Sequence, residues 1–199
     1  MKIDVRFDIK GALRKLDLAK KQIPFAVARG LTWTARDVRQ DVMAAMPQAL
    51  DRPSPFTMRG IGYRPATKQT LTSEVFIRDT QATYLSKLIS GGTRRPRGKA
   101  LLVPSSDFPT DQYGNPSKAA LRRLRSRKDV FSGTIRGVGG IWQRTGKGGR
   151  PGVKLLLAFE PTTQYRPTFP FVEIAKRSVA KRLKGNLERS IADAMRTAR

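Results

Sequence analysis

The chain has 199 residues, enough for one domain with a hydrophobic core, and carries 40 Lys and Arg against 15 Asp and Glu, a formal charge of +25. It contains no histidine and no cysteine, which excludes imidazole acid–base catalysis, thiolate nucleophiles, disulfides and thiolate zinc sites. A charge of this size favours an anionic partner or an acidic protein surface. It also favours a role in binding or in a structural assembly over a role in catalysis.

The N-terminal third predicts a strand followed by two helices. Apolar residues alternate with charged ones over residues 2–9, which is typical of a half-buried strand. Leucines at 13, 16 and 18 predict a short amphipathic helix that ends near Lys21. Pro24 suits the first turn of a helix, and apolar residues at spacings of three and four then predict a long helix over residues 24–46, which we expect Pro47 to end.

The middle of the chain is the most basic part. Residues 47–70 are rich in Pro and Gly and are expected to form a loop or arm, followed by a strand at 71–77 and a short helix at 83–89. Residues 91–129 contain a short apolar strand at 100–103, a turn at 111–116 and a polar, positive helix at 117–128. We interpret residues 91–129 as a basic insertion within a single domain that spans residues 1–199.

The C-terminal third predicts a hairpin and a long helix. Residues 138–143 and 153–159 flank a flexible basic tip, and a single apolar stripe then runs along a helix from residue 171 to 197. Because this stripe is longer than one small sheet can cover, we expect part of it to form a subunit interface. The expected interface residues are Val179, Leu183, Leu187 and Ile191.

The order of these elements predicts an α+β fold, in which a mostly antiparallel sheet is flanked by long N-terminal and C-terminal helices. Within it, residues 91–154 carry 15 Lys and Arg against three Asp, a local charge of +12. An isolated basic run is usually a solvated surface, but at this density contact with DNA or an acidic protein becomes the better interpretation. The expected contact residues are Arg94, Arg95, Arg97, Lys99, Arg122, Arg123, Arg125, Arg127, Lys128, Arg144, Lys147 and Arg150.

Motifs for catalysis and for base-specific recognition are missing from the sequence. The segment from Gly140 to Lys147 resembles a phosphate-binding loop but has the wrong spacing, and Gly148 stands where a magnesium-binding Ser or Thr is needed. The Asp and Glu residues of the chain are too few and too scattered for a nuclease metal site. We therefore expect no enzymatic activity and no cofactor, and any nucleic-acid contact to be to the backbone.

Nothing in the sequence predicts a membrane segment. The longest uncharged apolar run, residues 155–159, is far shorter than the roughly 20 residues needed to cross a bilayer. The N-terminus lacks the apolar segment of a secretory signal, so we expect the chain to fold in a cytoplasm.

Five short phrases, taken in order, resemble one family. They are Asp51-Arg52-Pro53-Ser54-Pro55-Phe56-Thr57, Tyr84-Leu85 followed by Gly91-Gly92-Thr93-Arg94, Asp111-Gln112-Tyr113-Gly114-Asn115, Gly140-Ile141-Trp142-Gln143-Arg144, and Phe169-Pro170-Phe171. Together they resemble minor tail proteins of tailed bacteriophages, the tail-completion group that includes minor tail protein Z. The resemblance spans nearly the whole chain from Pro24 onward, although the segment between Gly92 and Leu101 is shorter than in the family.

This resemblance implies a non-enzymatic virion protein with an α/β fold, located at the head-proximal end of the tail and made in the host cytoplasm. There it would complete the tail and help to join it to the DNA-filled head, as a homo-oligomeric ring that we expect to be sixfold. The implied partners are the tail terminator or tail tube protein, head–tail connector proteins, and genomic DNA or the tape measure protein in the channel. The alternative is a non-specific nucleic-acid-binding protein that acts outside a virion.

Overall fold

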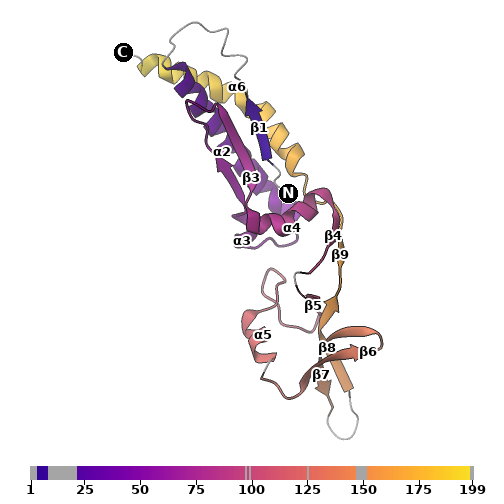
Figure 1. Ribbon diagram of the computed structural model, residues 1–199. Helices are drawn as coiled ribbons and strands as arrows, with labels where there is room; N and C mark the ends of the chain where they lie inside the picture. The colour runs from indigo at the N-terminus through magenta and orange to yellow at the C-terminus, as the bar shows by residue number, and fades with distance from the viewer. Residues whose placement is uncertain are drawn as a thin grey trace. The chain divides into compact units, whose positions relative to one another are not determined.

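The protein folds as two compact units, residues 1–90 with 167–199 (unit 1) and residues 91–166 (unit 2) (Figure 1). The computed structural model describes residues 4–8, 22–96, 98, 100–124, 126–146 and 152–197. The fold is α+β, as the sequence predicted, with antiparallel sheets in each unit and a long helix near each end of the chain. The short helix expected to end near Lys21 lies outside the described residues.

Unit 1 combines a three-stranded sheet with two long helices. Strands β1 (Asp4–Asp8), β3 (Thr72–Ile77) and β2 (Ile61–Arg64) form an antiparallel sheet with β3 in the centre. Helices α2 (Ile23–Ala49) and α6 (Phe171–Thr197) have 27 residues each and lie side by side (Figure 1). The short α3 (Pro55–Met58) and α4 (Asp79–Ser90) complete the unit.

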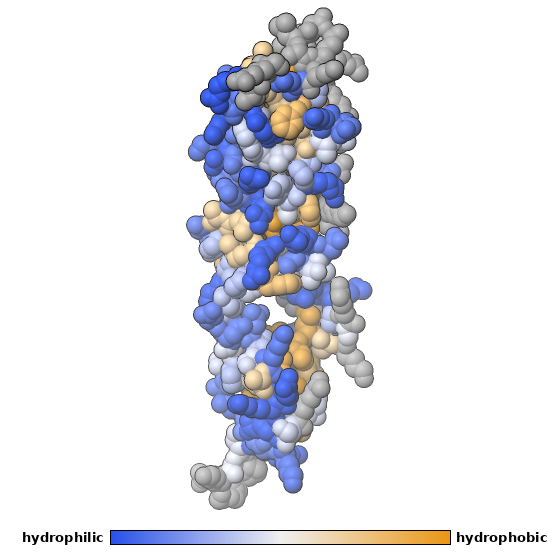
Figure 2. Space-filling model, turned by 90° about the vertical axis from the view of Figure 1, so that its left-hand side faces the viewer, coloured by the Kyte–Doolittle hydropathy of each residue, from blue (hydrophilic) through white to orange (hydrophobic). Residues whose placement is uncertain are grey.

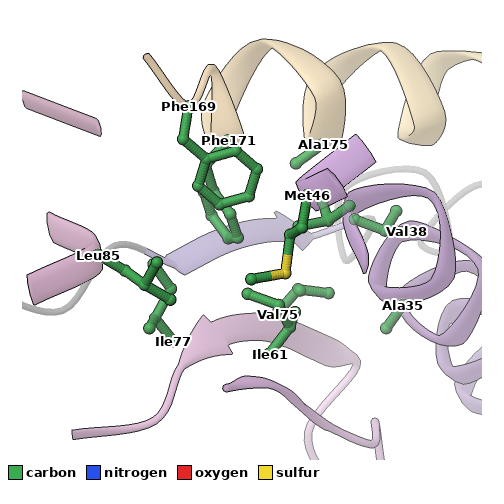
Figure 3. Packing of buried hydrophobic residues seen from close by; sticks show 11 residues of the cluster. Ala35, Val38, Met46, Ile61, Val75, Ile77, Leu85, Phe169, Phe171 and Ala175 are labelled. Carbon is green, nitrogen blue, oxygen red and sulfur yellow. The ribbon is translucent and has the colours of Figure 1, made fainter. Parts of the chain in front are cut away.

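The core of unit 1 lies where α2, α4 and the start of α6 cover one face of this sheet. Val75 and Ile77 of β3 and Ile61 of β2 point into it and are at most 2% exposed. Met46 of α2, fully buried, extends between them and Phe171 of α6 (Figure 3). Burying a side chain of this size stabilises the fold by about 1.5–3 kcal/mol, so this contact holds the last turn of α2 on the sheet.

Helix α2 begins as predicted but does not end at Pro47. Pro24 occupies its first turn, and the helix continues to Ala49, where the Leu50 N–H donates to the carbonyl oxygen of Met46. Near the end of a helix, proline removes one backbone hydrogen bond while its fixed φ still suits the helix. Because the neighbouring Met46 is anchored in the core, the last turn persists.

The expected loop at residues 47–70 is also wrong, since it contains α3 and β2. Ser54 caps α3: its side chain accepts a hydrogen bond from the Thr57 N–H, and Pro55 stands in the first turn. On α2, Arg39 donates from Nε to the carbonyl oxygen of Ile61 at 2.9 Å, which pairs a backbone group at the free edge of β2.

The remaining predictions for unit 1 are confirmed with small changes. The buried face of the strand at 71–77 contains Leu71, Ser73, Val75 and Ile77. Helix α4 starts at Asp79, four residues before the predicted start. The C-terminal helix is present, and Phe169 and Phe171, in edge-to-face contact, fix its first turn in the core.

Unit 2 contains a four-stranded antiparallel sheet in the order β5-β8-β7-β6. Its strands are β5 (Leu101–Pro104), β6 (Val130–Ile135), β7 (Val138–Thr145) and β8 (Gly152–Glu160). A second, two-stranded sheet pairs β4 (Gly92–Arg94) with β9 (Thr163–Tyr165), and α5 covers Lys118–Leu124. The predicted hairpin is therefore confirmed as β7 and β8.

The core of unit 2 is small and depends on a β-bulge. The pairing shifts between Ile141 and Trp142, which face Leu157 and Leu155, so Leu156 has no opposite residue. The shift allows the consecutive Leu156 and Leu157 both to be buried, at 4% and 0% exposure. They pack with Phe108 and with Leu124 of α5.

Unit 2 also differs from the predicted insertion in extent. The separate unit reaches Arg166 instead of residue 129, because β5, before the basic helix, pairs with β8, after it. Strand β6 was missed, and α5 ends at Leu124 instead of residue 128. Beyond Leu124 the N–H groups of Ser126 and Arg127 bond three residues back, as in a turn.

Candidate anion-binding surfaces

The contact between α2 and α6 contains a row of hydrogen bonds beside its apolar contacts. Every fourth residue on the inner side of α6 carries a hydrogen-bonding group that reaches α2. We call this set the polar ladder; it consists of Ser178, Arg182, Asn186 and Ser190. Because residues four apart share one face of a helix, the ladder determines which side of α6 faces α2 and which side faces outward.

Asp41 of α2 receives the first two members of the ladder. Ser178 Oγ donates to Asp41 Oδ2 at 2.7 Å, and Arg182 donates to both carboxylate oxygens, at 2.9 and 3.1 Å. Burial raises the pKa of Asp41, but the hydrogen bonds from Ser178 and Arg182 together outweigh it and hold the pKa below its usual value. The Asp41 carboxylate is therefore an acceptor that orients α6.

The other two members of the ladder reach the first half of α2. Asn186 Nδ2 donates to Asp37 Oδ2 at 2.8 Å, and Ser190 Oγ donates to the carbonyl oxygen of Ala26 at 2.6 Å. Arg29 Nε donates in turn to Ser190 Oγ at 2.9 Å. The two helices also approach closely at Gly30 of α2, where an added Cβ would lie only 3.0 Å from Leu187 Cδ2 of α6.

The outward side of α6 carries a row of exposed cations that the sequence analysis did not single out. We call it the cationic face; it consists of Lys176, Arg177, Lys181 and Lys184. Two further exposed cations of α6 have partners within the chain, since the Arg189 guanidinium lies over the Trp33 ring of α2 at 5.4 Å and Arg196 Nη2 pairs with Asp193 Oδ1 at 3.0 Å. Two acids, Glu173 and Glu188, share that side. The signal is present in the sequence, because these charges lie opposite the apolar stripe at helical spacing.

In unit 2, the predicted contact residues fall on several elements. Arg94 is part-buried on β4, where its Nη1 lies 3.5 Å from the Tyr165 hydroxyl oxygen, and Arg95 follows it in an exposed position. Arg122 and Arg123 are exposed on α5. Arg97, Lys99, Arg125, Lys147 and Arg150 lie outside the described residues.

Three of the predicted contact residues come together around Asp129. Arg127 Nε donates to Asp129 Oδ1 at 3.0 Å, and the backbone N–H of Arg144 donates to the Asp129 carbonyl oxygen at 2.7 Å. Arg144 Nη1 also lies 3.5 Å from the carbonyl oxygen of Lys128, and its guanidinium lies over the Phe131 ring at 4.6 Å. The hydrogen bond from Arg127 is the largest cause of a lowered pKa at Asp129. Arg127 is thus already paired within the chain.

The four predicted subunit-interface residues are all partly buried. Val179 packs against the core of unit 1, and Leu183 and Leu187 pack against a second cluster formed by Val27, Ala28, Leu31 and Leu71. These contacts give most of the apolar stripe a partner inside the chain, namely α2 and the residues around it. A contact of these residues with a second subunit stays a prediction.

Hydrophilic residues cover most of the molecular face shown in Figure 2. In the described parts of the chain, no group of three or more Asp and Glu side chains is placed to hold a metal ion. Among the same residues, no helix is both long enough and apolar enough to span a bilayer.

Comparison with known proteins returned no similar one: no protein-family model, no curated protein and no solved structure matches this chain.

Proposed function

We propose that this chain is a structural virion protein at the head-proximal end of a bacteriophage tail. It completes the tail and helps to join it to the DNA-filled head, as a homo-oligomeric ring between the tail tube or its terminator and the connector proteins. The observation that carries the proposal is the imbalance between exposed cations and the acids that could neutralise them within the chain.

The acids of the described residues are largely engaged already. Asp41 pairs with Arg182, Asp129 with Arg127, and Asp193 with Arg29. Glu74 pairs with Arg64, and Asp107 with Lys154. With a formal charge of +25, these pairs leave a large surplus of cations on the surface. Like charges repel over a Debye length of roughly 8 Å at physiological salt, so an assembly with DNA or acidic neighbours offsets a cost that the free chain carries.

The phrases that resemble the tail-completion family occupy positions on which this fold depends. Ser54 and Thr57 form the cap of α3, and Thr57 Oγ1 lies 3.1 Å from the Tyr84 hydroxyl oxygen. Asp111 Oδ1 accepts from the N–H groups of Tyr113 and Asn115 in a tight turn, both at 2.9 Å. The residues that carry the resemblance are thus caps, turns and core residues, which supports a fold shared with that family. The role in the virion is part of the proposal and rests on the resemblance.

The test is the location of the protein. Tails purified from the phage that encodes it are imaged by cryo-electron microscopy, with and without an antibody fragment against the chain. We expect extra density from the antibody at the head-proximal tip, with the symmetry of a ring. A chain found in the infected cell but missing from purified tails and complete particles would overturn the proposal and favour a nucleic-acid-binding protein that acts outside the virion.

A further inference from the structure

The cationic face of α6 retains most of its charge because few groups among the described residues neutralise it. Lys176, Arg177 and Lys181 form no ion pair with a described acid, although the charge of Lys181 helps to lower the pKa of Asp41. Lys184 approaches Glu188 at 3.8 Å, but these side chains are 87% and 65% exposed, and pairs of this kind are weak in water. The row from Lys176 to Lys184 extends over about 12 Å at 1.5 Å per residue. It therefore presents a positive edge to the solvent.

Three of the exposed positions beside these cations hold small residues. Ala180, Gly185 and Ala192 are all exposed on the same side of α6. A Cβ added to Gly185 would meet no atom within 4 Å, so packing within the chain does not require glycine there. Glycine weakens the interior of a helix relative to alanine. A partner that approaches the helix backbone closely at this point would explain it.

We propose that the cationic face of α6 binds the phosphate backbone of double-stranded nucleic acid. A second copy of this face is disfavoured because it carries the same charge. A protein partner needs an apolar centre in its interface, whereas no exposed side chain between Glu173 and Ala192 is apolar and larger than alanine. Surfaces that bind duplexes are instead polar and strongly positive.

Binding at this surface is independent of base sequence and sensitive to salt. A span of about 12 Å corresponds to about three or four base-pair steps of 3.4 Å, enough for the exposed Lys and Arg side chains to contact several phosphates. Each contact releases counterions, so the affinity falls as the salt concentration rises. The inference does not rest on the proposed function, because duplex DNA is available both in a tail channel and in the host cell.

The first test uses two triple variants of the full chain with the same change in net charge. One replaces Arg177, Lys181 and Lys184, which share the cationic face, with Gln; the control replaces the exposed Arg59, Arg78 and Arg166 with Gln. Fluorescence anisotropy measures the affinity for a random 30-base-pair duplex between 50 and 200 mM salt. We expect the α6 triple to lose at least about tenfold in affinity, with a salt slope smaller by up to about three, and the control to lose about twofold or less.

Equal losses in the two triples would overturn the proposal, because net charge alone would then explain binding. A triple on α6 that binds duplex like the unmodified chain, but no longer joins the assembled tail, would assign the face to an acidic protein and overturn it equally. Circular dichroism verifies that α6 remains helical in each variant; glutamine is a good helix former, so the helical signal should be kept.

The second test separates binding from stability. Gly185→Leu should raise the melting temperature of the chain by about 2–4 °C, since leucine favours helices and the space around residue 185 is open. The same side chain would obstruct a close backbone contact, so duplex affinity should fall about threefold or more. A variant that is more stable and binds duplex with unchanged affinity would show that no ligand approaches this point.

Discussion

The two units differ in what holds them together. Unit 1 has a continuous core, and its two long helices are aligned by hydrogen bonds from one side of α6 to α2. Among the described residues of unit 2, four buried apolar side chains form a small core, and the sheet depends on the bulge at Ile141 and Trp142. The stability of unit 1 therefore depends mainly on side-chain packing and helix alignment, whereas the stability of unit 2 depends more on local backbone geometry.

The largest effect should come from a single methyl group in unit 2. In Gly140→Ala the new Cβ would overlap the Leu157 carbonyl oxygen and lie 2.7 Å from Leu155 Cδ1, against backbone that cannot move freely. We expect a loss of about 3 kcal/mol in the stability of unit 2, at the upper end for overpacking.

The neighbouring glycine and the two tryptophans supply the control and the measurement. A Cβ at Gly139 would be 3.7 Å or more from any neighbour, so Gly139→Ala should change stability little. Trp33 lies on α2 in unit 1 and Trp142 on β7 in unit 2, so replacing one by Phe leaves a fluorescent probe of the other unit. If Gly140→Ala shifted the denaturation of both probes equally, the units would unfold as one.

A smaller effect is expected from the ion pair that aligns the helices of unit 1. Asp41→Ala removes the acceptor of Arg182 and Ser178. Because the Asp41 side chain is one-third exposed, at 33%, the loss should be about 1–2 kcal/mol, less than for a fully buried pair. Urea denaturation followed by Trp33 fluorescence measures it. Asp51→Ala is the control, since Asp51 is 83% exposed and pairs with its neighbour Arg52; a similar loss there would contradict a special role for Asp41.

The sequence predicted the elements of unit 1 better than those of unit 2, for a physical reason. A helix of 27 residues repeats its apolar period many times, so α2 and α6 are found from their spacing alone. Short strands joined by tight turns lack that repetition. The β6–β7 hairpin turns at Arg136 and Gly137, both with positive φ, and arginine is not the Asn or Asp that usually marks such a turn.

The candidate surfaces were predicted less completely than the fold. Charge density pointed to unit 2, where Arg127 proved to be paired with Asp129. The cationic face of α6 becomes evident once the polar ladder fixes which side of the helix faces α2. The helical period alone does not show whether an apolar stripe or the row of polar residues beside it is more deeply buried. In α6, Ser178 and Ser190 are buried, whereas the adjacent apolar residues of the stripe, Val179 and Ile191, are only partly buried.

The pH dependence of unit 1 should be weaker still than the effect of Asp41→Ala. The folded chain holds the pKa of Asp41 below that of the unfolded chain, so the stability contributed by this ion pair is complete above about pH 4. It is lost as the pH falls through the lowered pKa. We expect the acid-induced loss of stability to be smaller in Asp41→Asn than in the unmodified chain, when urea denaturation is compared at pH 7 and pH 3. Identical losses would mean that the carboxylate titrates alike in both states.

The smallest effect concerns Asp129 at the surface of unit 2. The hydrogen bond from Arg127 holds the pKa of Asp129 below its usual value, while both side chains are 41% exposed. Nuclear magnetic resonance titration of the carboxyl carbon should show this lowered pKa, and Arg127→Gln should move it back towards the ordinary aspartate value. Stability should hardly change, because exposed pairs contribute little. A carboxyl that titrates identically in the two proteins would show that the pair is open in solution, and that Arg127 is as available to an anionic partner as Arg122 and Arg123.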